Sequence, residues 1–388
     1  MADVINLTSV KKKKSRRRFF RRLLVLILLT AAVVIVLMNK DTIEEMGILD
    51  FAEEKLFGYN TNPGFPVDYM GGNGNALYKV SDGVLVATDT YLLTYSTKGS
   101  LKNYAQHSFY NLRADTYKNY ELIYDRGGKE LFIYRDGEKK YSKTLTGQIT
   151  DAVYSSKGGV AVLTDTGSFA TRLTVFNGTL SKEVFGWYDT EYQAFAVAFA
   201  GNGEDFAVAC YGVSEGQLLT KIIFFSLSSN DVQAELTLQG TMAVSIGYKS
   251  NGTLMVIGDD RTVVVDGKGN VTGTYSYEGR TLSFYQQTSS EGVLLIFEPT
   301  NEENSSSLVF LNKKAEEEYA ATVNENIRDV SLSDKTAAVL TERSVFYYSF
   351  TENTVKQIAT ESDGYRVLLK NRDIYVLGFS QLKKLSPN

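Results

Sequence analysis

A repeating pattern of apolar and polar positions organises most of this chain. From Asn75 onward, a turn rich in Gly, Asp, Asn or Ser is followed by four to six apolar residues and then often by an acid. Eight copies of the apolar run align, at residues 84–89, 120–125, 160–165, 206–211, 254–259, 293–298, 337–342 and 374–379. Their first residues lie 36, 40, 46, 48, 39, 44 and 37 positions apart. A repeat of about 40 residues is the size of one four-stranded β-propeller blade.

One unit, residues 149–185, shows the four strands that a blade needs. The pattern predicts a first strand at 149–154, an almost continuously apolar second at 160–164, a third at 173–176 and a more polar fourth at 181–185. Strands between neighbouring blades need apolar side chains on both faces, whereas an outer strand meets water. The fourth strand is therefore expected to lie on the outside.

Short turn signals separate the predicted strands. Asn-Gly pairs begin at residues 73, 177, 202 and 251, and Asp-Gly pairs at 82, 136, 266 and 363. Both pairs suit type I′ hairpin turns. The chain has only four prolines, none inside an apolar run. We expect an all-β fold, a β-propeller of eight blades. Seven is the alternative, because residues 110–118 and 313–318 make weak strands.

The last unit is too short to complete a blade by itself. From Tyr365 it has room for about three strands before the chain ends at Asn388. An unpaired inner edge would expose backbone donors and acceptors. We therefore expect residues 66–69 to supply the missing outer strand and close the ring.

An uncharged apolar segment, residues 23–38, precedes the repeats. It predicts a transmembrane helix, which Phe19 and Phe20 extend toward the roughly 30 Å needed to cross the bilayer core. Nine Lys or Arg from Lys11 to Arg22 place the N-terminus in the cytoplasm. A cleaved signal peptide is the alternative, although residues 37–41 offer no small-x-small cleavage site. We expect a basic cytoplasmic segment (1–22), the helix (23–38), a stalk and linker (39–65) and an extracytoplasmic propeller (66–388) of a bacterial envelope protein.

Charge and composition narrow the classes of partner and chemistry. Residues 41–388 hold 31 basic and 44 acidic residues, a net charge of −13 that repels nucleic acid. With His107 and Cys210 the only examples of their kinds, zinc clusters and internal disulfides are excluded. A catalytic triad would have to use His107, whose simpler role is that of a loop residue. Carboxylate pairs remain the conventional acid–base option.

Known propeller enzymes and interaction repeats leave signatures that are missing here. Quinoprotein blades dock on recurrent tryptophans, and this chain has only Trp187. The Gly-His and Trp-Asp pairs of WD40 units and the boxes of sialidases are also absent. The glycine-rich residues 71–75 lack the lysine and helix of a phosphate loop. We therefore expect neither an enzyme nor an obligatory cofactor.

An acid ends the apolar run in six of the eight units. These acids are Asp89, Asp125, Asp165, Asp259, Glu298 and Glu342. Equivalent positions of a propeller share one face, so side chains turned toward the axis would form a negative rim for calcium or a basic peptide. In the alternative interpretation each acid caps its own turn. Arg126, Arg261 and Arg343 near three of the acids favour that alternative, and Tyr211 and Phe379 interrupt the ring.

Several short motifs resemble a known family. The stalk, residues 64–68 (Gly-Phe-Pro-Val-Asp) and residues 123–128 (Ile-Tyr-Asp-Arg-Gly-Gly) are similar to a clostridial family of membrane-anchored propellers, domain-of-unknown-function family 5711. The resemblance implies fold and location and carries over no catalytic residue.

Together these features predict a membrane-anchored extracytoplasmic binding or scaffold module. Its partner would be an envelope protein, a peptide or a glycan, with the membrane bound through the N-terminal helix. The alternative is a carboxylate-based glycoside hydrolase or another envelope-polymer enzyme, which would need two acids about 5 to 10 Å apart in a cleft.

Overall fold

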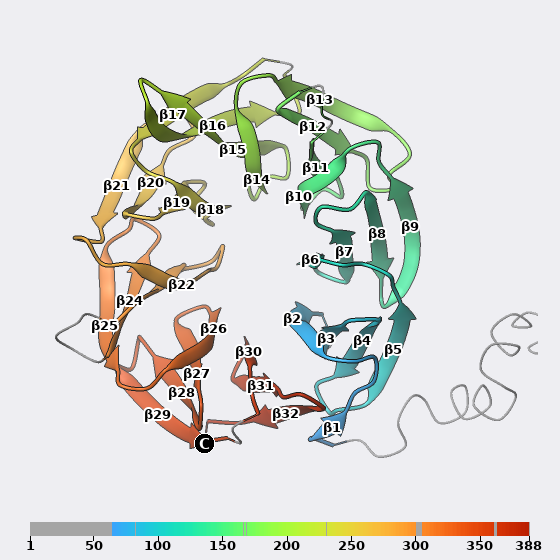
Figure 1. Cartoon of the computed structure of the whole chain (residues 1–388), viewed down its shortest axis with the longest axis vertical. Coiled ribbons are helices and arrows are strands. Elements are labelled where there is room, and N and C mark those ends of the chain that lie inside the picture. Colours follow the sequence, from blue (N-terminus) through green and yellow to red (C-terminus); the bar gives the residue numbers. More distant parts are fainter. Residues whose placement is uncertain are drawn as a thin grey trace, which may run out of the picture. The chain divides into compact units, whose positions relative to one another are not determined.

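The computed structural model describes residues 64–387 apart from 82, 166, 168, 230, 300–304 and 361–362. These residues form eight four-stranded antiparallel sheets arranged as the blades of a propeller (Figure 1). The predicted all-β fold and the count of eight are confirmed. The two segments whose weak strand pattern allowed a count of seven form β6 (Leu112–Tyr117) and the turn that leads into β25 (Glu317–Val323).

The first four blades follow one another along the chain. They are β2 (Gly74–Val80), β3 (Gly83–Thr88), β4 (Tyr91–Ser96) and β5 (Leu101–Gln106); β6, β7 (Tyr120–Asp125), β8 (Glu130–Arg135) and β9 (Glu138–Thr144); β10 (Gln148–Tyr154), β11 (Val160–Asp165), β12 (Thr171–Phe176) and β13 (Glu183–Asp189); and β14 (Gln193–Phe199), β15 (Asp205–Ser214), β16 (Gln217–Ser226) and β17 (Ala234–Gln239).

The remaining four blades include the one that closes the ring. They are β18 (Ala243–Tyr248), β19 (Leu254–Gly258), β20 (Arg261–Val265) and β21 (Val271–Ser276); β22 (Leu282–Gln287), β23 (Gly292–Phe297), β24 (Ser306–Asn312) and β25; β26 (Ile327–Ser333), β27 (Thr336–Thr341), β28 (Ser344–Ser349) and β29 (Thr354–Ala359); and β30 (Arg366–Lys370), β31 (Asp373–Leu377) and β32 (Gln381–Leu385) with β1 (Val67–Asp68).

The apolar core lies between neighbouring blades. First strands contact the first strands of the next blades, so they line the centre of the ring. The second strands β3 and β23 are buried along their whole length, whereas the fourth strands β9 and β29 are mostly exposed. One core cluster joins the third and fourth blades through residues such as Leu163 and Phe206. This arrangement explains the continuous apolar runs, because a second strand is covered on both faces.

The N-terminal strand closes the ring as the sequence predicted. In β1, Val67 pairs with Leu382 and Asp68 with Gln381 of β32. Side chains reinforce this junction, since Tyr69 Oη donates to Gly378 O at 2.6 Å and Tyr365 Oη donates to Gly74 O at 2.6 Å. The last blade therefore combines both ends of the propeller.

Local turns differ from the sequence-based expectation in two respects. The fourth strand of the third blade begins at Glu183 rather than at residue 181, because the Asn177 side chain accepts bonds from the backbone of Ser181 and Lys182 and holds them in a turn. Asp136 and Gly137 both have positive φ, as a type I′ turn requires. At Asn251–Gly252 only the glycine does, and the Lys249 amide spans the turn to Thr253 O.

The N-terminal predictions fall outside the described residues. These predictions are the basic segment (1–22), the transmembrane helix (23–38) and the stalk up to residue 63. Across the described part of the chain, residues 64–387 with the gaps given above, we find no helix long and apolar enough to cross a membrane.

The closing junction makes a testable contribution to stability. We expect Tyr365→Phe to lower the free energy of unfolding by about 1–2 kcal/mol, because Gly74 O loses its hydroxyl donor. Urea unfolding of the two proteins measures the difference. Tyr188→Phe is the matched control, since Tyr188 is mostly exposed and its hydroxyl has no hydrogen bond to a described residue. Equal effects of the two substitutions would show that the junction adds no stability.

Candidate functional site

The six acids predicted from the sequence lie on one face of the propeller. In each blade the second strand ends where the first begins, because consecutive strands are antiparallel. We call this the acid-bearing face: the connections that precede the first strands and those that join second to third strands. The shared face was expected from the repeat. The acids follow second strands, however, and so stand one strand away from the centre.

Three of the acids bind the start of the first strand in their own blade. Asp89 Oδ2 accepts from the Asn73 amide at 3.1 Å, Asp125 Oδ1 from the Asn111 amide at 2.8 Å, and Asp259 Oδ1 from the Met242 amide at 2.9 Å. Each carboxylate therefore holds together the two strand ends of one blade.

The other acids also have local surroundings. Asp165 Oδ1 accepts from the Gly167 amide at 2.9 Å. Glu342 lies 3.9 Å from Arg328 rather than pairing with Arg343, and the amide of Glu298 donates to Thr281 O. Arg261 pairs at 2.6 Å with Asp260, not with Asp259. The carboxylate of Asp165 therefore caps its own turn, whereas that of Glu342 faces Arg328 of the first strand.

The described residues do not gather the acids into a shared metal site. Within the parts of the chain that the structure describes, no three His, Cys, Asp or Glu side chains are grouped so that they could hold a metal ion. The acids nevertheless keep their common face. Calcium binding at this face stays a prediction. The described carboxylates could contribute to it only as ligands from separate positions.

The innermost strands carry carboxylates that sequence reasoning missed. Asp115, Asp151 and Asp329 accept backbone amides of the next blade, from Tyr154 at 2.7 Å, Val197 at 3.0 Å and Val367 at 2.8 Å. Burial raises the pKa of each, that of Asp329 to about 6. The available signal was an acid in the middle of a predicted first strand. These carboxylates link neighbouring blades.

The single histidine makes local hydrogen bonds, and the single cysteine is buried in the core. Nδ1 of His107 accepts from the Phe109 amide at 3.1 Å, and Nε2 lies 3.1 Å from Thr88 O. Burial lowers the pKa of His107. Cys210 is buried between the third and fourth blades, where burial raises its thiol pKa to about 12. His107 therefore fits the role of an ordinary loop histidine, and Cys210 is a protonated core residue.

Exposed apolar side chains concentrate on the acid-bearing face. Tyr110 is 98% exposed, Phe379 67%, Tyr188 62%, Val213 61% and Leu218 50%. Met70, Met242 and Val244 add to the same face. On the opposite face, the comparably exposed residues described are fewer: Val232 in a connection, and Val184, Val271 and Val355 at the starts of fourth strands. Exposed apolar groups gathered on one side of a soluble domain are typical of an interaction surface.

A long hairpin in the fourth blade projects from this face. β15 and β16 have ten residues each, whereas their neighbour β14 has seven. Pairing between β14 and β15 stops at Tyr211, and β15 continues until Val213 pairs with Leu218 next to the turn. We call this part, residues 212–218, the hairpin tip. Its two apolar side chains, Val213 and Leu218, stand on paired strands and are exposed to water.

Solved structures with the same fold share little sequence with this chain. The C-terminal WD40 domain of Sif2 is similar with a TM-score of 0.61 at 9% identity, over 84% of this chain and 99% of that one. BamB from Moraxella catarrhalis has a TM-score of 0.54 at 11% identity, over 84% and 98%. Apo AztD from Citrobacter koseri has 0.54 at 11%, over 78% and 90%. At such identities the likeness shows the propeller fold alone.

Sequence comparison identifies the family. The search of curated proteins gives no match. A family of unknown function, DUF5711, matches residues 71–384 and so covers nearly the whole propeller. The resemblance drawn from the sequence motifs is confirmed, while the clostridial origin and the membrane anchor stay predictions. The chain belongs to the DUF5711 family.

Proposed function

We propose that this protein is a binding or scaffold module held at the outer face of the cell membrane by residues 23–38. The observation that carries the proposal is the concentration of exposed apolar side chains on the acid-bearing face. A ring of eight sheets presents those side chains on a rigid support, which reduces the entropy lost on binding. The predicted anchor would keep the propeller close to other envelope proteins.

The chemistry of this face favours a polypeptide partner. Val213 and Leu218 offer apolar contacts, while the six acids that other blades carry on the same face favour a neutral or basic partner. The net charge of −13 over residues 41–388 argues against nucleic acid. We therefore propose an envelope protein or peptide that covers the hairpin tip.

The hydrolase alternative has less support. It needs two carboxyl groups facing one cleft. The pocket between the fourth and fifth blades is lined by one carboxylate, that of Asp205. Binding without catalysis therefore accounts better for the arrangement.

An affinity pulldown from native membranes tests the apolar face. We expect the full-length protein to capture at least one envelope protein, and Val213→Glu with Leu218→Glu to reduce this capture about tenfold or more. The matched control is Val184→Glu with Val355→Glu, since these residues are similarly exposed on outer strands. Equal capture by the parent and both double variants would exclude the hairpin tip as the binding surface.

Reporter fusions test the membrane topology. A reporter that is active only outside the cytoplasm should be active after Asn388 and inactive before Ala2, because the nine basic residues before the apolar span retain the N-terminus inside. Changing the arginines from Arg16 to Arg22 to glutamate should weaken or invert insertion. A cytoplasmic C-terminal reporter in the parent would contradict the proposed location.

A further inference from the structure

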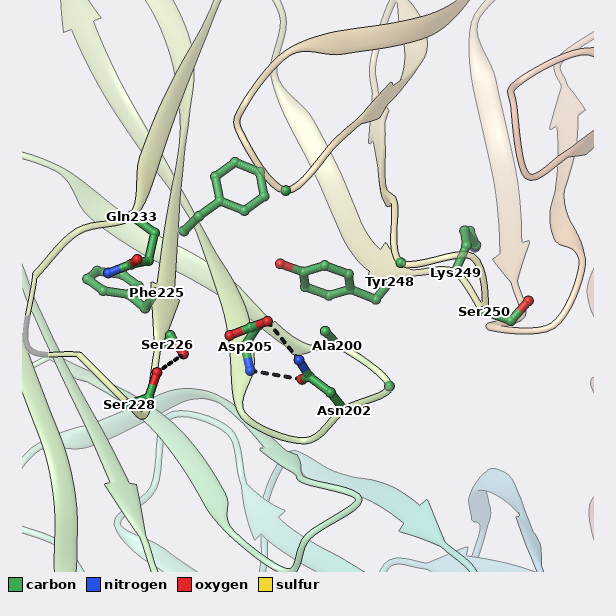
Figure 2. A pocket seen from close by; sticks show the side chains of 14 residues that line it. Ala200, Asn202, Asp205, Phe225, Ser226, Ser228, Gln233, Tyr248, Lys249 and Ser250 are labelled. Carbon is green, nitrogen blue, oxygen red and sulfur yellow. Dashed lines mark hydrogen bonds between the residues drawn. The ribbon is translucent and has the colours of Figure 1, made fainter.

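A polar pocket lies between the fourth and fifth blades on the face opposite the acids. It has a volume of about 470 Å³, within the range of roughly 300 to 1,000 Å³ typical of small-molecule sites. Turns from both blades surround it: the β14–β15 turn, the β16–β17 connection and the β18–β19 turn (Figure 2). The seven-residue β16–β17 connection contributes Ser228 and Gln233 to one wall.

Aromatic side chains give the pocket an apolar wall. Phe224 lines it and belongs to the core between the two blades, where Tyr248 packs against the same cluster. Figure 2 shows Tyr248 pointing from the fifth blade into the pocket, while Asp205 and Asn202 are joined on the side of the fourth. The core contacts hold these aromatic groups in place without a ligand.

Two acceptors, Asp205 and Gln233, face the pocket beside the hydroxyl groups of Tyr248, Ser226 and Ser228. Asp205 Oδ2 accepts from Asn202 Nδ2 at 2.7 Å, and Asp205 Oδ1 has no donor among the described residues. Gln233 donates through Nε2 to Asp231 O at 2.7 Å, which leaves its Oε1 available. The Tyr248 hydroxyl has no hydrogen bond to a described residue. Burial, with a smaller contribution from Asp205, raises its pKa and keeps it protonated.

The lysine in the lining does not offer its charge to the pocket. Lys249 Nζ donates to Gln287 Oε1 at 2.9 Å, to Thr288 O at 2.8 Å and to Gly292 O at 3.3 Å, all in the sixth blade. Asp205 is then the charged group available to a ligand. A phosphate or carboxylate would meet repulsion, whereas hydroxyl or ammonium donors would meet acceptors.

We infer that this pocket binds a small carbohydrate of one or two rings, neutral or carrying an amino group. A sugar ring has an apolar face for Tyr248 and several hydroxyl donors for Asp205 and Gln233. The inference does not depend on the apolar hairpin tip, which lies on the opposite face. The protein would then present two separate surfaces, one for a polypeptide and one for a glycan.

Calorimetric titration of the full-length protein in detergent tests the inference. The probes are glucose, N-acetylglucosamine and glucosamine, with glucose 6-phosphate as the anionic comparison. We expect at least one of the first three to bind with a Kd below about 10 mM, and glucose 6-phosphate to bind at least about fivefold more weakly than glucose. No binding by the three uncharged or basic sugars, or preference for the phosphate, would overturn the inference.

Three variants locate the binding. Asp205→Asn should raise the Kd for the sugar about tenfold, because a charged acceptor is lost. Tyr248→Phe should raise the Kd several-fold, because it removes the hydroxyl group while keeping the aromatic ring. Asp136→Asn is the control: Asp136 also accepts from an asparagine side chain, that of Asn119, at a turn outside the pocket. Melting temperatures measured without sugar establish that each variant is folded. Unchanged affinity in both pocket variants would place the sugar elsewhere and overturn the inference.

Discussion

Replacing Lys249 with methionine is expected to lower the free energy of unfolding by about 3 kcal/mol. Lys249 is 2% exposed, and its Nζ lies within hydrogen-bond distance of three oxygens of the sixth blade. Methionine has a comparable length but no donor, so three acceptors at this blade junction lose their partner. Urea unfolding of the two proteins at pH 7 measures the difference.

The effect of this substitution should depend on pH. Burial lowers the pKa of Lys249 from 10.5 to about 7. Between pH 7 and 10.5 the unfolded chain binds a proton that the folded protein has released, so the contribution of Lys249 to stability increases with pH in that window. The deficit of the methionine variant should therefore be larger at pH 9 than at pH 6. Equal deficits at pH 6 and pH 9 would mean that the three oxygens hold the ammonium form despite burial, because the folded and unfolded chains would then bind the same proton at both pH values.

A surface lysine provides the control for this prediction. Lys335 Nζ lies 2.9 Å from Glu318, and both side chains are partly exposed. An exposed pair of this kind contributes roughly 0 to 1 kcal/mol. We expect Lys335→Met to remain within that range, and a loss equal to that of Lys249→Met would contradict the importance of the buried contacts.

Replacing Asp151 with alanine is expected to have a similar effect, about 3 kcal/mol. Asp151 lies on β10 in the third blade and joins both neighbours. Its Oδ2 accepts from the Val197 amide at 3.0 Å, and its Oδ1 accepts from Tyr124 Oη at 2.8 Å. Alanine would leave both partly buried donors without an acceptor. Thermal or urea unfolding measures the loss.

Asp165 provides the matched control for Asp151. Both acids follow an apolar residue and a threonine on a strand of the third blade. The carboxylate of Asp165, however, is exposed and accepts a hydrogen bond from its own turn. We expect Asp165→Ala to lower the free energy of unfolding by about 1 kcal/mol or less. If both alanine variants were equally stable, the carboxylate of Asp151 would not be a significant link between the blades.

The strand order and ring closure could be predicted because they depend on local patterns. Each second strand needs apolar residues on both faces, so runs such as residues 160–164 identify it without knowledge of the neighbours. The spacing of these runs counts the blades. Closure by residues 66–69 followed from the need to pair the last edge, and the pairing of Val67 with Leu382 agrees.

The candidate site was less accessible from the sequence. The repeat correctly placed Asp89 and its equivalents on one face, but the partner of each carboxylate depends on the connection opposite it. Asp89 binds the Asn73 amide, whereas Asp165 binds its own turn. The apolar hairpin tip was missed because the continuation of the Phe206 run through Val213 resembles an ordinary buried strand. Only the point at which β14 stops pairing exposes those residues.

The sequence by itself therefore determined the blades and favoured eight of them over seven, because each blade depends on apolar periodicity and turn chemistry within about 40 residues. It also predicted the closure, because the last blade lacked a strand. Tertiary structure decided what lies between the blades. Lys249 meets Gln287, Asp151 meets Val197, and Asp205 faces the pocket with Tyr248, each pair drawn from consecutive blades. The physical reason is that such pairings depend on the twist and packing of two neighbouring sheets, which no local pattern specifies.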